Sequence, residues 1–396
     1  MEFIFNKKAR IAFSILMLIG VIAMIFGYIN DESSHHNRFW ANIFINGFFY
    51  FGISIGALFF LALQYATEAS YMVVLKRVFE AVSQFIYVGS AILIIFFLAG
   101  TFQWHHIYHW MDPEVFNIES PAYDAIIAAK QVYLNQPFFW LRTLLFIGVW
   151  CYFTHLFRKR SLLEDELGGT KIHYKNITTS AIFIVFFGFT SSIASWDWIM
   201  SIDTHWFSTL FGWYVFSGLW VSAIIFITLF VIFLKGRGYL KEVNSSHIHD
   251  LGKWMFALSF LWSYLWFSQF ILIWYSNIPE EVTYFITRIE EYKLLFFGMF
   301  FINFIFPMVI LMSRDSKRMS GYLIFVGIII FIGHWLDVYL MIVPGGVNEL
   351  NIGFMEVGMA IGFFGLFLYI VFNALTKAPM VVKHHPYLEE SKHLHI

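Results

Sequence analysis

The sequence has little charge and a single cysteine. Asp, Glu, Lys and Arg make up only 13% of the 396 residues, whereas a soluble globular protein has about 25%. The formal net charge is −1, so the chain lacks the basic surplus typical of nucleic-acid binding. Cys151 alone cannot form an internal disulfide, and an iron–sulfur cluster is usually held by four cysteines. No P-loop, G-x-G-x-x-G or G-x-S-x-G motif stands at a helix boundary. These shortages exclude a disulfide-stapled protein, a nucleic-acid-binding protein and a chain with its own cysteine-held cluster.

Hydrophobic residues make up 59% of the chain and gather in ten long apolar runs. Roughly 20 mostly apolar residues are enough for a helix to cross a bilayer. The first run has no small-residue cleavage motif after it, so we expect a membrane span and not a signal peptide. The sequence therefore predicts an all-α polytopic membrane protein with about ten transmembrane helices. The predicted spans are 10–28, 39–64, 82–103, 137–157, 177–199, 207–234, 251–276, 292–312, 319–342 and 352–375.

Basic residues alternate between the predicted loops. If the N-terminus is cytoplasmic, the inner segments hold 20 of the 25 Lys and Arg residues. The outer segments hold Arg38, Lys130, Arg288 and Lys293, and Arg142 lies within a span. Because cytoplasmic loops are enriched in Lys and Arg, we expect both termini in the cytoplasm. The predicted chain crosses its membrane several times.

The second and sixth spans share ladders of small residues. Gly52 and Gly56 form one ladder, and Gly218 and Ser222 form the other. Such spacing lets two helices approach closely. We expect two parallel four-helix bundles, spans 2–5 and 6–9, with spans 1 and 10 beside them; chance similarity between Phe-rich helices is the alternative. The predicted divisions are 1–38 (first span and outer loop), 39–206 and 207–342 (the two bundles), and 343–396 (last span and cytoplasmic tail).

Five ionisable residues from four predicted spans fall in the outer half of the membrane: Arg142, Asp197, His334, Asp337 and Glu356. Intramembrane ionisable residues are costly, so they indicate function by default. We predict that Arg142 is the counter-ion of Asp197, and that His334 is the counter-ion of Asp337 or Glu356. Together they are candidates for the outer half of a proton path. Two alternatives stay open: side chains that snorkel to the headgroups, and an Arg142–Asp197 pair that only joins two helices.

The inner half is expected to hold fewer charges, with Glu68 and His155 as candidates for the inner half of that path. The C-terminal tail is polar, and we expect it to be mobile. His105, His106 and His109 suggest a metal site. Two of them, His105 and His109, are spaced i, i+4, but no third ligand follows at a metal-site spacing. We therefore predict no metal bound by this chain and no catalytic residue of its own.

Three segments carry a resemblance to a known family. They are SWDWIMSIDTHWFSTLFGWYVFSG at 195–218, YHWMDP at 108–113 and YLNQPFFWLR at 133–142. The chain resembles the ActF subunit of bacterial alternative complex III, one of the NrfD-like membrane subunits that interact with quinol. With ten spans and about 400 residues, the resemblance covers essentially the whole chain.

The resemblance implies a respiratory complex of the bacterial inner membrane that oxidises quinol and passes electrons to cytochrome c or another acceptor. Iron–sulfur clusters and haem c would then sit in partner subunits, and this chain would bind no cofactor except phospholipid. The implied partners are an ActC-like sister membrane subunit, an iron–sulfur subunit, multihaem and monohaem cytochrome c subunits, small membrane subunits and a terminal oxidase. For this chain we expect a structural and proton-conducting role, with the quinol-binding residues left open. The alternatives are a free-standing proton-coupled transporter and a purely structural scaffold.

Overall fold

The computed structural model describes residues 2–347, 350 and 352–395. This part of the chain is helical and contains no β-strand; one isolated bridge joins Glu2 to Pro379. The α-helices are α1 (Lys7–Ile29), α2 (Asn37–Ala66), α3 (Lys76–Ser83), α4 (Ile86–Thr101), α5 (Ala125–Ala129), α6 (Gln136–Leu167), α7 (Lys171–Trp198), α8 (Phe211–Gly236), α9 (Ser245–Ser276), α10 (Pro279–Glu290), α11 (Lys293–Phe300), α12 (Phe306–Ile310), α13 (Arg314–Arg318), α14 (Ser320–Gly346), α15 (Phe354–Leu375) and α16 (Leu388–Lys392).

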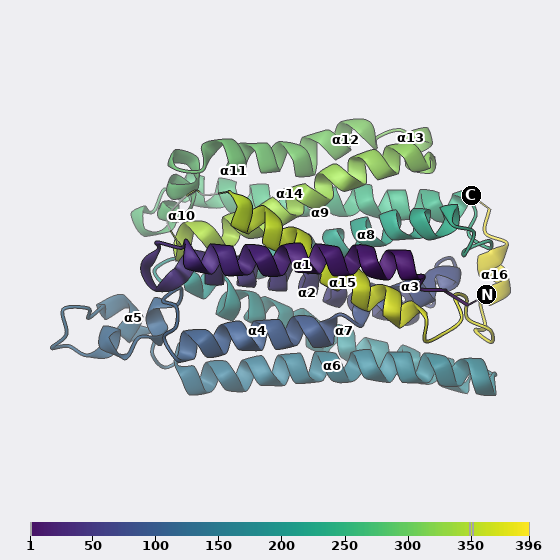
Figure 1. The fold of residues 1–396 in the computed structure, drawn as a ribbon, viewed down its shortest axis with the longest axis horizontal. Helices are drawn as coiled ribbons and strands as arrows, with labels where there is room; N and C mark the ends of the chain where they lie inside the picture. Colours follow the sequence, from purple (N-terminus) through teal and green to yellow (C-terminus); the bar gives the residue numbers. More distant parts are fainter. Residues whose placement is uncertain (1, 348–349, 351, 396) are drawn as a thin grey trace.

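Within the described residues, ten helical segments are long and apolar enough to cross a membrane. Each coincides with one predicted run, so the prediction of an all-α chain with ten candidate spans is confirmed for the described residues. Two spans are composite, because α3 with α4 forms one and α11 with α12 forms another. The long helices lie side by side along one direction (Figure 1).

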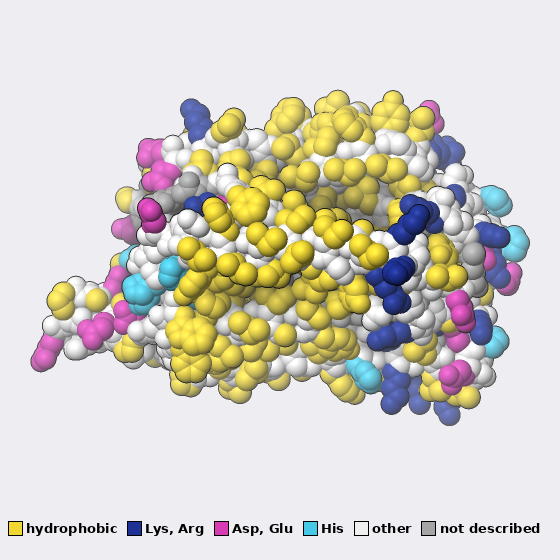
Figure 2. All heavy atoms as spheres, viewed as in Figure 1, with side chains coloured by type: hydrophobic (Ala, Val, Ile, Leu, Met, Phe, Trp, Pro, Cys, Tyr) yellow, Lys and Arg dark blue, Asp and Glu magenta, His cyan; other side chains and the backbone are white. Residues whose placement is uncertain are grey.

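The bundle has two ends of different character. We call the end that carries residues 2–6 and 376–395 the termini side, and the end that carries the connections 102–135 and 199–210 the loop side (Figure 1). On the face shown in Figure 2, Lys and Arg gather toward the termini side, and apolar side chains cover the middle. An apolar belt of this kind fits a lipid environment.

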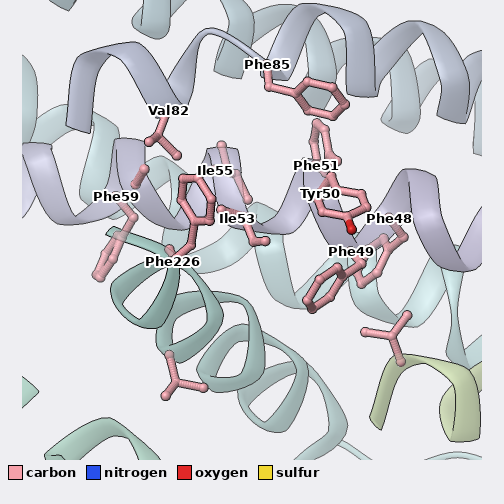
Figure 3. Packing of buried hydrophobic residues seen from close by; sticks show 14 of the residues in the cluster. Phe48, Phe49, Tyr50, Phe51, Ile53, Ile55, Phe59, Val82, Phe85 and Phe226 are labelled. Atoms are coloured by element: carbon pink, nitrogen blue, oxygen red, sulfur yellow. The ribbon is translucent and has the colours of Figure 1, made fainter. Parts of the chain in front are cut away.

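Helix α2 forms the centre of the bundle. Almost all of its membrane-spanning part is buried, whereas an amphipathic surface helix buries only one face. Its aromatic residues therefore pack in several directions. Figure 3 shows Phe51 pointing toward Phe85 of the α3–α4 break, while Phe49 points to the opposite side, where its ring lies 5.2 Å from that of Phe331 on α14.

Close helix packing depends on glycine at two contacts. A Cβ atom on Gly56 of α2 would lie 2.8 Å from the backbone oxygen of Leu219 on α8, and one on Gly20 of α1 would lie 2.5 Å from Gly362 Cα on α15. The second and sixth spans therefore approach each other closely at Gly56. Gly218 of the predicted second ladder instead faces Asp337 and Trp262.

Two spans are interrupted within the bundle. Gln84 and Phe85 separate α3 from α4, and residues Phe301–Ile305 form a π-helical turn between α11 and α12. Asn303 in that turn is fully buried against Gly333 of α14, and its side chain has no hydrogen-bond partner among the described residues. Such turns occur often at functional sites.

The C-terminal tail is docked against the termini side, so the prediction of a mobile tail is wrong. Lys383 donates its backbone N–H to Asp165 Oδ1 (2.8 Å), and the backbone oxygen of Asp165 lies 2.9 Å from His384 Nδ1. Ser391 is buried, and its Oγ accepts from the backbone N–H of Val74 (3.2 Å). These contacts explain why a polar segment is ordered here: its backbone and short side chains bond to the helix ends.

Candidate functional site

Asp337 is a buried carboxylate that only neutral groups contact. It lies on α14 toward the loop side and is 1% exposed. Oδ1 accepts from the hydroxyl of Tyr214 on α8, and Oδ2 accepts from Trp262 Nε1 on α9 at 2.9 Å. No ion pair joins it to a basic residue of the described chain. Other buried acids in the described spans have a Lys or Arg partner, as Asp197 and Glu356 do, so Asp337 differs from them.

Arg288 is a buried cation that has no carboxylate partner among the described residues. It lies in α10, whose sequence starts with Pro279 and places Arg288 in the last turn, where a cation offsets the helix dipole. Its Nε donates to the backbone oxygen of Leu340 (3.0 Å), and its guanidinium carbon lies 3.3 Å from the centre of the Tyr284 ring. Burial lowers the pKa of Arg288 from its usual value and raises that of Tyr284 to about 12.

Asp337 and Arg288 line the same small cavity. It is about 10 Å³ in size, close to what one water molecule needs. Its other polar lining groups are those of Tyr214, Gln269 and Tyr284. A positive and a negative group therefore face one cavity without touching each other, an arrangement in which water can join them.

His334 lies one turn before Asp337 on α14 and faces a second cavity of about 10 Å³, which Asp337 also lines. Both ring nitrogens are buried and have no hydrogen-bond partner among the described residues. The ring stands edge-on to Trp262, with 5.3 Å between ring centres. The prediction that His334 is the counter-ion of Asp337 or Glu356 is therefore wrong. Asp337 bonds to Tyr214 and Trp262 instead, because these donors lie on the facing helices.

Glu356 forms a structural cluster of its own. Arg38 donates to both of its oxygens, at 2.8 and 2.9 Å, and Asn42 Nδ2 donates to Oε1 at 3.0 Å. Oε2 also accepts from the backbone N–H of Gly353 (2.7 Å) and so caps the start of α15. These contacts fully occupy the carboxylate and join α15 to α2.

Arg142 and Asp197 form the predicted ion pair between α6 and α7. Nε lies 2.6 Å from Oδ2 and Nη2 lies 2.9 Å from Oδ1, so the pair is bidentate. The rings of Tyr133 and Phe138 each lie 4.1 Å from the guanidinium carbon. Fully paired charges of this kind favour a structural role, the alternative that the sequence left open.

A larger cavity of about 240 Å³ opens on the loop side between the 102–135 connection and the end of α7. Tyr133, which covers Arg142, lines it on one side, and Trp206 lines it on another. Trp206 stacks on Tyr284 with 4.0 Å between ring centres, and Tyr284 covers Arg288. Lys130 also lines it, and burial lowers the pKa of its ammonium group. Ring contacts thus connect this cavity to the surroundings of Asp337.

The three histidines at positions 105, 106 and 109 do not converge on one point. His105 is buried, and its Nε2 lies 3.1 Å from the backbone oxygen of Phe96. Burial lowers the pKa of His105 to about 4. His106 lies against His35, with 3.8 Å between ring centres, and His109 is exposed. His105 therefore supports the loop by packing as a neutral ring.

Glu68 and His155, the two predicted inner-half residues, are both exposed. Glu68 accepts from the hydroxyl of Tyr387 (2.8 Å), and His155 lies on an outer face of α6. The expectation of few charges in this half is wrong, because the termini side holds a network of buried ion pairs. Its members come from α3 and α6: Lys76–Glu164 (2.8 Å), Arg77–Glu80 (2.7 Å), Arg77–Asp165 (2.5 Å) and Arg158–Glu80 (2.6 Å).

The sequence interpretation missed Tyr214, Trp262 and Arg288. The two aromatic residues lie in long apolar runs, where nothing distinguishes a hydrogen-bond donor from a packing residue. Arg288 was assigned to a loop because α10 is shorter than a span. Its signals were present, since Pro279 and two glutamates stand in the first turn and Arg288 in the last.

The fold and these buried charges define a multi-pass membrane protein with ten candidate spans in the described chain. Comparison with models of protein families and with curated proteins finds no match for this chain. Arguments about its function therefore rest on the motifs and on the geometry given above.

Proposed function

We propose that this chain is a cofactor-free membrane subunit of a quinol-oxidising respiratory complex of the alternative complex III type, and that Asp337 exchanges protons in it. The sequence segments at 108–113, 133–142 and 195–218 support the first part. One observation carries the second: Asp337 is a buried acid of the described spans that has only neutral partners, beside two cavities.

Each feature of the surroundings supports proton exchange at this carboxylate. A negative charge on Asp337 is not offset by direct contact with a cation, so its charge can change without breaking an ion pair. Arg288 faces the same cavity and favours water or an anion there. His334, with two unpartnered ring nitrogens, lines the adjoining cavity. In this proposal Arg142–Asp197 and Arg38–Glu356 stabilise the bundle and do not carry protons.

The proposed complex lies in the bacterial inner membrane with both termini in the cytoplasm. This orientation is favoured because 20 of the 25 Lys and Arg residues belong to the termini-side segments. The proposed partners are an ActC-like sister subunit, an iron–sulfur subunit, cytochrome c subunits and a terminal oxidase. Their clusters and haems supply the redox chemistry. The contact between α2 and α8 at Gly56 supports two parallel bundles, since these are the first helices of the two proposed repeats. Phospholipid would cover the apolar belt.

Purification of the tagged chain from its native membranes in mild detergent tests the assignment to a complex. We expect haem c absorbance and co-purifying iron–sulfur and multihaem proteins by mass spectrometry. A colourless, lone chain would contradict it.

A second candidate function, a proton-coupled transporter, is favoured by the two helix interruptions at Gln84–Phe85 and Phe301–Ile305. Transporters often place broken helices at their substrate sites. A lone chain that moves protons with a solute in proteoliposomes would favour this second function.

A further inference from the structure

We propose that Glu164, His173 and His385 form a binding site for one divalent transition-metal ion of the Zn²⁺ class, which fastens the C-terminal tail to the α6–α7 hairpin. The site lies on the termini side, away from Asp337, and does not depend on the function proposed above. It departs from the sequence-based expectation of no metal, which considered histidines close together in the sequence.

Three separate parts of the chain bring these side chains together. Glu164 lies in the last turn of α6 and His173 in the first turn of α7. A turn through Gly168 and Gly169, with φ of 65° and 74°, places the two helix ends next to each other. The tail then crosses the hairpin and places His385 beside His173, with 4.9 Å between ring centres. One possible ligand atom from each of the three residues lies within 4.8 Å of the other two.

The donor atoms are buried and largely unused. Glu164 is 0% exposed and His173 is 3% exposed. Glu164 Oε1 and both ring nitrogens of His173 have no hydrogen-bond partner among the described residues. His385 Nδ1 accepts one long hydrogen bond from the backbone N–H of Tyr387 (3.3 Å). Metal binding through Nε2 requires the ring proton on Nδ1, so this long hydrogen bond would be given up. Buried polar atoms without partners are rare in folded proteins, and a bound cation would satisfy all three residues.

The ligand set selects the class of metal. Two imidazole nitrogens and one carboxylate oxygen suit Zn²⁺ and its neighbours, whereas Mg²⁺ and Ca²⁺ prefer oxygen ligands throughout. Zinc–ligand bonds of about 2.0–2.2 Å require the three donor atoms to draw together by about 1 Å, within reach of side-chain rotation. His173 and His385 also line a cavity of about 20 Å³, which has room for a water molecule as fourth ligand.

Lys76 is compatible with this site as a neighbour of the metal ligand. Its Nζ lies 2.8 Å from Glu164 Oε2, so it uses the oxygen that the metal does not need. Ligating carboxylates are commonly hydrogen-bonded through their other oxygen. Without a metal, Lys76 alone would offset the charge of Glu164, and the ring nitrogens of His173 would have no hydrogen-bond partner among the described residues.

The test uses the full chain, purified in its native complex, stripped with EDTA and reloaded with Zn²⁺ or Co²⁺. We expect about one Zn²⁺ per chain by elemental analysis after gel filtration, and tetrahedral Co²⁺ absorption bands. His385→Ala should lower the affinity at least about tenfold. His393→Ala is the matched control, because His393 is an exposed histidine of the same tail, and it should bind like the wild type. Full binding in His385→Ala would overturn the proposal, as would a wild type that binds no metal.

A second measurement separates loss of the metal from loss of the fold. Trypsin can cleave the tail after Lys383 and Lys392. If the metal fastens the tail, Zn²⁺ should slow this cleavage severalfold in the wild type and in His393→Ala. The same Zn²⁺ should have no effect on His385→Ala, whose gel-filtration profile reports whether the ten-helix bundle is intact. Equal cleavage with Zn²⁺ and with EDTA in the wild type would contradict the fastening role. Neither readout depends on quinol oxidation, so a failed respiratory assignment leaves this test intact.

Discussion

The ion pair between Arg142 and Asp197 should stabilise the bundle as one unit. Its two contacts of 2.6 and 2.9 Å are charge-assisted hydrogen bonds in a buried site. The rings of Tyr133 and Phe138 cover the guanidinium from 4.1 Å each, so water cannot replace a lost partner easily. The perturbation we consider is Arg142→Met, alone and together with Asp197→Leu.

The magnitudes follow from what each change leaves buried. Arg142→Met leaves Asp197 without a cation, which should lower the free energy of unfolding by about 3–5 kcal/mol. Asp197→Leu should have a cost of similar size, because it leaves the guanidinium unpaired. The double variant removes both charges, so it should lose about 2–3 kcal/mol less than the sum of the single changes. Arg142→Lys keeps the charge but loses the bidentate geometry and the ring stacking, so its loss should fall below that of Arg142→Met.

The assay is unfolding of the detergent-solubilised chain by titration with sodium dodecyl sulfate, followed by circular dichroism of the helices. Additive losses, with a deviation below about 0.5 kcal/mol, would refute the reasoning, because they would show that the two charges do not depend on each other. An Arg142→Lys variant as unstable as Arg142→Met would refute the importance of charge and assign the effect to shape.

Three further outcomes are expected. Asp337→Asn should lower the number of protons released per electron in proteoliposomes without loss of haem-containing partners. Asp250→Asn is the control, because Asp250 is a buried acid paired with Lys253, and it should leave this number unchanged. Equal stoichiometry in both variants would exclude a proton role for Asp337. Gly56→Ala should lower the free energy of unfolding by about 1–3 kcal/mol through overpacking, whereas Gly298→Ala, with open space around its Cβ, should not, as measured by the same titration. His105 has a folded-state pKa of about 4, so the unfolded chain binds its proton first as the pH falls. Stability should therefore drop by up to about 3 kcal/mol between pH 6.5 and 4, and His105→Gln should remove that part of the pH dependence; an unchanged slope would contradict it.

The ten spans could be predicted because membrane insertion depends on length and hydrophobicity alone. The Arg142–Asp197 pair could also be predicted, since the two residues lie at similar depth on consecutive helices. The same depth argument failed for His334. Residues spaced i, i+3 share a helix face, but their partners come from the helices opposite that face. The spacing does not show which helices pack against that face. Tyr214 and Trp262 therefore could not be predicted as the hydrogen-bond donors to Asp337.

The termini side was predicted poorly for a different reason. Its charges lie near helix ends, where charged residues are expected to be exposed to solvent and to follow the positive-inside bias. The fold instead buries Arg77 and Lys76 together with acids from α6. His385 was assigned to a mobile tail because its neighbours are polar. Only the contact with the α6–α7 hairpin shows that it is buried, and residues 164, 173 and 385 have no spacing pattern that would group them.

The distribution of partners among the buried acids separates two roles that composition cannot distinguish. When a buried acid that is paired with Arg or Lys takes up a proton, its cation is left unpaired. The free energy of unfolding of the protein then falls. Glu80, Asp197 and Glu356 are of this kind, with Arg158, Arg142 and Arg38 as partners from other helices. Protonation at any of these acids would weaken a contact between helices. Asp337 holds only a hydroxyl and an indole N–H, and both can still bond to the carboxyl group after it takes up a proton. A change of charge at Asp337 therefore leaves the helix contacts in place, and this is the property that a proton-exchanging group inside a rigid bundle needs.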